Sequence, residues 1–224
     1  MTATQCVIGL LVSGVVAATS SVCGGPDLTP VLRALPAATG QAVIVHAPTA
    51  ATTYATVETF EKLDGAWHPA FPAMVARIGE QGFSDHHRES VPSTPSGVYG
   101  FGDTMYGNAP DPGTRYPYHQ LTEGDWWNGN PSTVGYNTFQ HGTDPGGASE
   151  ALWQVTPAYD YLAFIAYNVP AVPGAGSAIF LHVNGSGDTS GCVTLARTDL
   201  LRVLRWLDPT RSPRIVLGPD NELA

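Results

Sequence analysis

The stretch FLHVNGSGDTSGCVTL, residues 180–195, places two apolar runs on either side of a cluster of turn-forming residues. The apolar runs predict two strands, and the NGSGD between them predicts a turn. If this hairpin folds near Gly187, His182 and Cys192 lie directly opposite each other. Opposed residues point to the same face of a sheet, with their Cβ atoms roughly 4.5–5.5 Å apart. We therefore expect the imidazole to lie within reach of the thiol.

A histidine beside a cysteine is typical of sites that transfer acyl groups. The thiolate is the competent nucleophile, and a neighbouring imidazole lowers the pKa of the thiol toward an ion pair. Gly191, next to Cys192, would let a substrate carbonyl approach and leave backbone N–H groups free to form an oxyanion hole. The alternative is a buried structural cysteine near a core histidine. The predicted hairpin favours the cysteine acyl-transfer site.

Composition indicates the fold class and excludes one class of partner. The chain has 224 residues, of which 43% are hydrophobic, enough for the core of one large β domain. Its 25 glycines and 19 prolines indicate many turns and few long helices. The net charge is −9, whereas a nucleic-acid surface needs a basic patch. We expect a single, mainly β domain that does not bind nucleic acid.

Short apolar runs predict the strands of this domain. An Asp-Gly pair between alternating apolar residues predicts a hairpin turn at Asp64-Gly65. The segment 102–150 is rich in Gly, Pro, Asn and Asp, and we interpret it as a long loop region. The predicted strands are residues 41–48, 54–71, 73–79, 97–101, 161–169, 177–183, 192–195 and 214–218.

One helix is predicted near the C-terminus, over residues 198–209. Its apolar residues recur at spacings of three and four and form a single stripe: Leu200, Val203, Leu204 and Leu207. Thr198 is the predicted N-cap, and Pro209 is the predicted stop. The expected fold is therefore mainly β, with one helix close to the C-terminus.

The N-terminus carries an apolar run from Cys6 to Ala18, which is too short to span a bilayer. Its length suits a secretory signal with a small-residue cleavage site ending at Ala18; the alternative is a buried N-terminal strand or helix. Cys23 resembles a lipoprotein attachment site. We expect an exported protein with no permanent membrane span and, through Cys23, a candidate lipid anchor. The predicted divisions are a signal peptide (1–23), a linker (24–40), a catalytic domain (41–218) and a tail (219–224).

The segment SDHHRES, residues 84–90, concentrates histidines and acids, so it is either a metal site or a solvated loop. Adjacent residues on a strand point to opposite faces and rarely bind one ion together. No cysteine or His-x-x-x-His pattern lies nearby. We predict a solvated loop and no metal site.

Several aromatic and amide residues are candidates for contact with a substrate, and packing residues are the alternative in each case. Three of them lie in the long loop region, where Trp126, Trp127, Tyr136 and Asn137 would form a lid over a bound peptide. Another lies where the strand 161–169 ends and would border a cleft. The candidates are Trp127, Tyr136, Asn137 and Tyr167.

The segment HVNGSGDTSGCVTL resembles the catalytic segment of the L,D-transpeptidase (YkuD-type) family, in which a strand bearing a histidine precedes a Ser/Thr-His-Gly-Cys motif. Upstream, STPSGVYGF (93–101) is similar to the family's Thr-Pro-x-Gly-x-Tyr/Phe strand, and RIGEQGF precedes it. GDWWNGNPSTVGYN, YDYLAFIAYN and RTDLLRVLRWLDP look like the exported actinobacterial branch. The resemblance covers residues from about 40 to about 218.

The chain departs from the family pattern at two positions. Ser190 stands where the family usually has a histidine before Gly-Cys, and Thr194 stands where it usually has Asn or Arg. Any role of that second histidine is therefore open here. Cys192 and His182 match the motif directly.

The resemblance implies a β-sandwich catalytic domain that acts on peptidoglycan stem peptides. Cys192 would attack the carbonyl between diaminopimelate and the terminal D-Ala, and the thioester would be resolved by an amine to a 3→3 cross-link. His182 would act as the base, with the N–H groups of Ser190, Gly191 and Cys192 as oxyanion candidates. No cofactor is implied, and carbapenem-type β-lactams are expected as covalent inhibitors. The alternatives are a hydrolase (carboxypeptidase or amidase) using the same pair, and a non-catalytic wall-binding module.

Overall fold

The computed structural model describes residues 25–185 and 187–223. Residues 1–23, predicted as a signal peptide, lie outside the described residues. The helical elements are α1 (Thr29–Ala34), η1 (Leu152–Gln154), η2 (Ala158–Asp160), α2 (Arg197–Trp206), η3 (Pro209–Arg211) and α3 (Asp220–Leu223). The strands are β1 (Gln41–Ala47), β2 (Tyr54–Leu63), β3 (Ala66–Arg77), β4 (Phe83–Ser84), β5 (Thr94–Pro95), β6 (Gly97–Tyr99), β7 (Phe101–Gly107), β8 (Tyr118–Gln120), β9 (Asp125–Trp127), β10 (Phe139–His141), β11 (Glu150–Ala151), β12 (Leu162–Ile165), β13 (Phe180–Val183), β14 (Val193–Leu195) and β15 (Arg214–Pro219).

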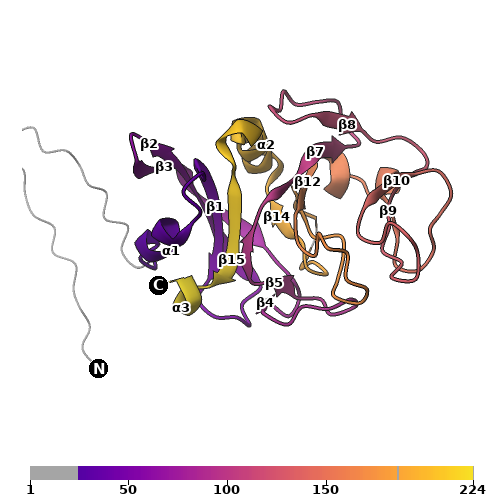
Figure 1. The fold of residues 1–224 in the computed structure, drawn as a ribbon, viewed down its shortest axis with the longest axis horizontal. Coiled ribbons are helices and arrows are strands. Elements are labelled where there is room, and N and C mark those ends of the chain that lie inside the picture. The colour runs from indigo at the N-terminus through magenta and orange to yellow at the C-terminus, as the bar shows by residue number, and fades with distance from the viewer. Residues whose placement is uncertain (1–24, 186, 224) are drawn as a thin grey trace, which may run out of the picture.

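A ten-stranded sheet dominates the molecule, in the order β6-β15-β1-β2-β3-β14-β13-β12-β7-β8 (Figure 1). β1 with β15, β13 with β14 and β7 with β8 are parallel pairs, and the other neighbours are antiparallel. The mainly β class predicted from the sequence is confirmed. The predicted hairpin at Asp64-Gly65 is confirmed as well, because both residues have the positive φ of a tight β-turn between β2 and β3.

The sheet is strongly curled, because a short connection in the chain joins strands near its two ends. β6 and β7 lie near opposite ends of the strand order, yet only Gly100 separates them in the sequence. Two peptide units span at most about 7 Å, so the two ends of the sheet must come close together. The predicted single strand 97–101 is therefore wrong, because the chain leaves the edge strand β6 at Tyr99 and enters β7, next to the other edge, at Phe101.

The inner face of the curled sheet holds the main core. Side chains alternate between the faces of a strand, and in β13 Leu181 and Val183 point inward. Helix α2 closes this core with the predicted apolar stripe, all of it fully buried: Leu200, Val203, Leu204 and Leu207. The helix begins at Arg197, and its N-cap is Ala196 without a side-chain hydrogen bond, so the predicted cap at Thr198 is wrong.

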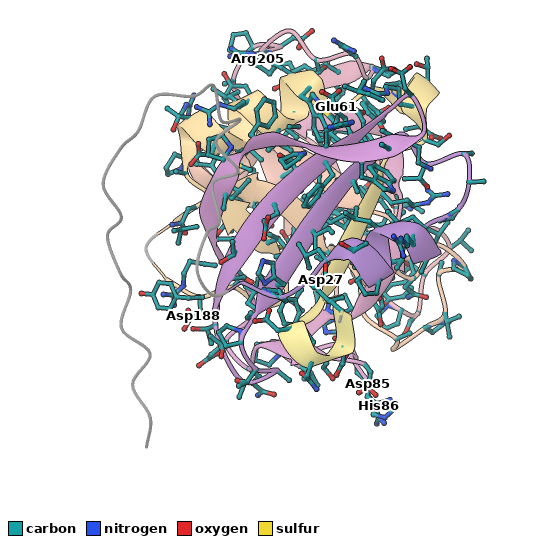
Figure 2. All side chains as sticks on the ribbon, turned by 90° about the vertical axis from the view of Figure 1, so that its left-hand side faces the viewer. Asp27, Glu61, Asp85, His86, Asp188 and Arg205 are labelled. Carbon is teal, nitrogen blue, oxygen red and sulfur yellow. The ribbon has the colours of Figure 1, made fainter. Side chains whose placement is uncertain are left out.

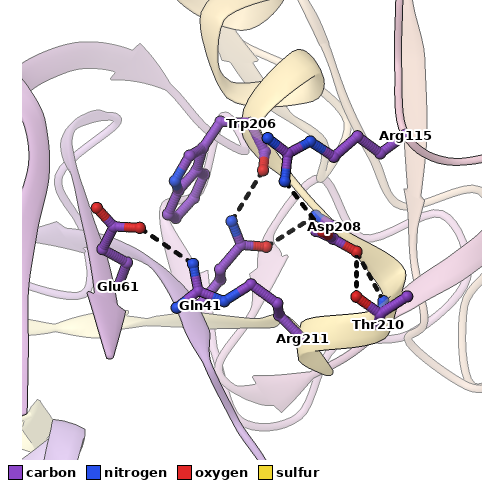
Figure 3. Close-up of polar contacts among 7 residues, drawn as sticks. All are labelled: Gln41, Glu61, Arg115, Trp206, Asp208, Thr210 and Arg211. Carbon is purple, nitrogen blue, oxygen red and sulfur yellow. Dashed lines mark hydrogen bonds and ion pairs between the residues drawn. The ribbon is translucent and has the colours of Figure 1, made fainter. Parts of the chain in front are cut away.

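The end of helix α2 is joined to β1 by a glutamine. The Gln41 side chain donates to the Trp206 carbonyl (2.8 Å) and accepts from the Asp208 N–H (2.7 Å) (Figure 3). These bonds satisfy backbone groups that the last helical turn leaves open. Two ion pairs, Arg211–Glu61 and Arg115–Asp208, flank them at 3.0 Å each. The helix is thereby fixed against the sheet that carries the functional residues.

The outer face of β15, β1 and β2 is covered by the terminal segments, in front of the strands in Figure 2. Helix α1, within the predicted linker, buries Leu28, Leu32 and Leu35 on this face. Helix α3, within the predicted tail, adds Leu223 and places Asp220 2.7 Å from buried His46. The described parts of both segments are packed onto the domain.

The segment 102–150 contains strands rather than the predicted long loop. It holds β7 to β11, of which β10, β9 and β11 form a separate three-stranded sheet. Trp127 of β9 packs against Phe164 of β12 and Phe180 of β13, with ring centroids 4.5 and 5.0 Å apart. This small sheet therefore covers the outer face of β12 and β13, where the candidate site lies.

Candidate active site

The strands that carry the histidine and the cysteine run parallel, so the predicted hairpin is wrong. His182 pairs with Thr194, not with Cys192. The segment between β13 and β14 does not reverse in a tight turn, because Thr189 first forms hydrogen bonds with the backbone that follows β3. Its N–H donates to the Ile78 carbonyl (3.1 Å), and its carbonyl accepts from the Glu80 N–H (2.9 Å). The chain then enters β14 from the same end as β13.

His182 and Cys192 nevertheless line one cavity of about 690 Å³. His182 alternates with the inward-pointing residues of β13, and Cys192 precedes Val193, which points inward. Both side chains therefore lie on the outer face of the sheet, beneath the β9–β11 layer. The cavity walls come from residues 87–92, 148, 150, 155, 158–159, 177–179, 185 and 187–190.

Two threonines shape the backbone just before the cysteine. Buried Thr94 donates to the Gly191 carbonyl (2.8 Å) and accepts from the Gly79 N–H (2.9 Å). Thr189 donates to the Cys192 carbonyl (2.6 Å) and accepts from the Gly191 N–H (3.1 Å). Gly191 has φ +144°, a conformation that favours glycine. Because the Gly191 N–H is already engaged, the N–H groups of Ser190 and Cys192 are the better oxyanion candidates.

The thiol of Cys192 rests against the start of β13. It donates to the Ala178 carbonyl and accepts from the Phe180 N–H, both at 3.3 Å. Burial raises the pKa of the Cys192 thiol, and the negative charge of Glu150 raises it further. We expected the imidazole to lower this pKa toward an ion pair, and in this state the opposite holds. The resting cysteine is a neutral thiol.

The His182 ring is also neutral. Burial lowers its pKa to about 4, although the carbonyls of Val183 and Ala158 favour the charged form. Since a carbonyl only accepts, the 2.9 Å contact with the Val183 carbonyl places a proton on Nδ1 and leaves Nε2 as the basic atom. Within residues 25–185 and 187–223, no hydrogen bond joins His182 to Cys192. A proton therefore moves between them only when the thiol leaves Ala178.

The four candidate substrate contacts lie behind the cavity wall rather than on it. Trp127 donates to Asn137 (3.0 Å), and Asn137 in turn donates to the Tyr167 carbonyl (2.9 Å). Tyr167 donates its hydroxyl to the Ala175 carbonyl (2.6 Å). Tyr136 donates to the carboxylate of Glu89, which does line the cavity. In this structure all four are hydrogen-bonded behind the wall, and their role as substrate contacts stays a prediction.

His87 is a cavity residue that the sequence interpretation missed. We expected the segment 84–90 to be a solvated loop, and Asp85 and His86 do project outward (Figure 2). His87, however, is buried on the cavity wall, 3.2 Å from the Ser93 hydroxyl and edge-on to Tyr167. Its spacing carries no motif, and only the packing of this loop distinguishes it from His86. In the described part of the chain, no three His, Cys, Asp or Glu side chains gather as metal ligands.

Glu150 is the second residue that was missed. It comes from the two-residue strand β11 and lines the cavity with Cys192. The hydroxyl of Tyr159 donates to its carboxylate. Nothing local in the sequence marks this glutamate, because its position depends on the pairing of β11 with β9.

The neutral thiol leads to a prediction about its reactivity. Because the Cys192 pKa is raised, its thiolate fraction near neutral pH should be smaller than that of a free thiol, whose pKa is about 8.5. We expect alkylation by iodoacetamide to accelerate only at a pH above that of N-acetylcysteine in the same tube. Mass spectrometry of the Cys192 peptide across a pH series measures this. A midpoint below that of the reference thiol would contradict a neutral resting cysteine.

Comparison with known families adds to this geometry. The model of the YkuD family, the L,D-transpeptidase catalytic domain, matches residues 34–216. No curated protein and no solved structure gives a significant match. The matched range contains both parallel strands of the site and the whole cavity wall. The chain belongs to the YkuD family of L,D-transpeptidase catalytic domains.

Proposed function

We propose that this protein is a cysteine-dependent L,D-transpeptidase that joins peptidoglycan stem peptides by 3→3 cross-links through a thioacyl-enzyme. Family membership implies peptidoglycan L,D-transpeptidase-type activity. The observation that carries the mechanism is the presence of Cys192 and His182 on the walls of one cavity. A non-catalytic wall-binding module would not need a nucleophile and a base at that place.

The first half-reaction forms the thioester. A tetrapeptide carbonyl enters the cavity. The Cys192 thiol then breaks its hydrogen bond to the Ala178 carbonyl and forms one to Nε2 of His182. Sulfur attacks the carbonyl carbon while His182 takes the proton, so no free thiolate has to form in the buried site. The N–H groups of Ser190 and Cys192 stabilise the oxyanion. His182 then gives the proton to the departing D-Ala amine.

The second half-reaction releases the enzyme. The amine of another stem attacks the thioester, the C–N bond forms, and the C–S bond breaks. The sulfur recovers its proton through His182. If water attacks instead, the same site is a hydrolase acting as a carboxypeptidase or amidase. The products therefore distinguish the two functions.

Export is part of the proposal. The apolar run and small-residue cleavage site near the N-terminus support a signal peptide over residues 1–23, and the resemblance to exported actinobacterial sequences supports the same location. Among the described residues, no helix has the length and apolar character needed to cross a membrane. Peptidoglycan lies outside the cytoplasmic membrane, so the proposed substrate and the proposed export agree.

The two residues of the pair should fail together. We expect Cys192→Ala to abolish thioester formation and His182→Ala to lower turnover strongly. The double variant should be scarcely slower than Cys192→Ala, because groups that act as a unit are non-additive. The measurement is mass spectrometry of products from purified stem tetrapeptides. A variant with full activity would remove its residue from the mechanism.

A carbapenem should acylate the resting enzyme. Its strained lactam carbonyl mimics the scissile amide, and the adduct should be stable where water is excluded. Intact-mass measurement should show one added drug mass on the protein and none on Cys192→Ala. Rapid loss of the adduct would favour the hydrolase, and no adduct on active protein would mean that the cavity rejects the lactam.

Maturation should remove the N-terminal segment. We expect the exported chain to begin between about residues 19 and 24, as small-residue cleavage sites require. N-terminal sequencing of the secreted protein tests this. If Cys23 carries a lipid, the protein should partition into detergent, and Cys23→Ser should abolish this behaviour. A mature chain that retains Met1 would contradict export by this signal.

A further inference from the structure

Glu150 is directed toward the nucleophile by strand register. It pairs with Trp127 across β11 and β9, and directly paired residues point to the same face of a sheet. Trp127 faces Phe180, which belongs to the same buried cluster as Cys192. The carboxylate therefore points into the layer that contains the thiol, and its charge reaches Cys192.

The same carboxylate is linked to the base. Tyr159, on η2, donates its hydroxyl to Glu150 and is buried. Its ring stands edge-on to His182, with centroids 5.1 Å apart and an interplanar angle of 83°. One tyrosine thus sets the position of the carboxylate and packs against the imidazole.

Glu150 has no cationic partner in the described part of the chain, and neither does Glu89, a second carboxylate of the cavity whose charge acts on Glu150. The third acidic residue of the cavity, Asp188, is paired with Arg77. His182 is neutral, and burial lowers the pKa of His87. Arg88 also lines the cavity, but its side chain is exposed and, among the described residues, forms no ion pair with Glu89 or Glu150. Leaving a partly buried carboxylate without a cation is costly. The missing positive charge can come from a bound ligand.

We propose that Glu150 binds the ammonium group of the acceptor, so that the cavity selects a primary amine over water for resolving the thioester. This inference rests on the proposed transpeptidase function and specifies its acceptor. Burial and the charge of Glu89 raise the pKa of Glu150, so its carboxylate is a stronger base than an exposed one.

The protons balance through two groups. The ammonium brings three protons: one stays on the new amide, one passes to Glu150 and then to solvent, and one passes through His182 to the sulfur. The C–N bond forms as the C–S bond breaks, and Cys192 returns to the neutral thiol. Glu150 thus converts the bound ammonium into the free amine, and His182 takes the second proton as the amine attacks the thioester.

The test compares the wild type with Glu150→Gln, which keeps an oxygen for the Tyr159 hydroxyl but removes the charge. Donor tetrapeptide is held fixed, the concentration of acceptor amine is varied, and mass spectrometry measures released D-Ala, cross-linked product and hydrolysed donor. The charge of Glu150 also acts on the Cys192 thiol, so the rate of D-Ala release is recorded but is not the readout. The readout is the ratio of cross-linked product to hydrolysed donor, because both form from the same thioester. The KM for the acceptor should rise about 10- to 100-fold, because a hydrogen bond to a charged group is lost. The amount of hydrolysed donor should rise as the amount of cross-linked product falls.

Glu123→Gln is the matched control, because it removes one exposed glutamate charge outside the cavity and should change nothing. Tyr159→Phe is a second variant, which releases the carboxylate without removing it and should raise the acceptor KM by a smaller factor. Glu150→Asp should restore part of the selectivity. Equal partitioning between amine and water in wild type and Glu150→Gln would overturn the inference. If the wild type itself releases no D-Ala, the proposed function fails instead.

Discussion

The hydrogen bonds between Thr189 and the backbone of residues 78–80 determine how the site is assembled. Because of these bonds the chain runs beyond the start of β14 before it turns. The hydrogen bond from Thr94 to the Gly191 carbonyl and the positive φ of Gly191 then direct the chain into β14. The outcome is a parallel pair of strands in which the cysteine stands just before its strand and the histidine within its own. A tight hairpin would have placed the two residues in direct opposition. The docked loop instead brings them to one cavity with the nucleophile beside a shaped stretch of backbone.

Burial sets the electrostatics of this cavity. The pKa of the thiol is raised and the pKa of the imidazole is lowered, so both groups are uncharged at rest. An ion pair between two such buried groups would lose its hydration without full compensation. The proposed mechanism therefore uses proton transfer that accompanies attack. A neutral thiol is also less reactive toward oxidants than a thiolate. The negative charge of the Glu150 carboxylate reinforces the neutral state of the thiol.

The small β9–β11 sheet supplies what the main sheet lacks. Without it, the outer face of β12 and β13 would expose Phe164 and Phe180, and the cavity would have one open side. Trp127 fills the space between the two sheets, and Asn137 ties the layer to Tyr167 and to the N–H of Ala178. These polar contacts do not involve His182 or Cys192 directly. They hold the wall that bears Glu150 and the backbone that receives the thiol.

Local features of the sequence were sufficient where neighbouring residues set the structure. The stripe of helix α2 follows from side-chain spacing, and the turn at Asp64-Gly65 follows from the positive φ that these residues tolerate. The presence of His182 and Cys192 at one cavity was also predictable, because the motif that contains both is continuous. Their relative strand direction was not, since it depends on Thr189 meeting residues about a hundred positions earlier. The split at Gly100, the register of Glu150 and the neutral protonation state likewise arise only when distant segments pack together and exclude water.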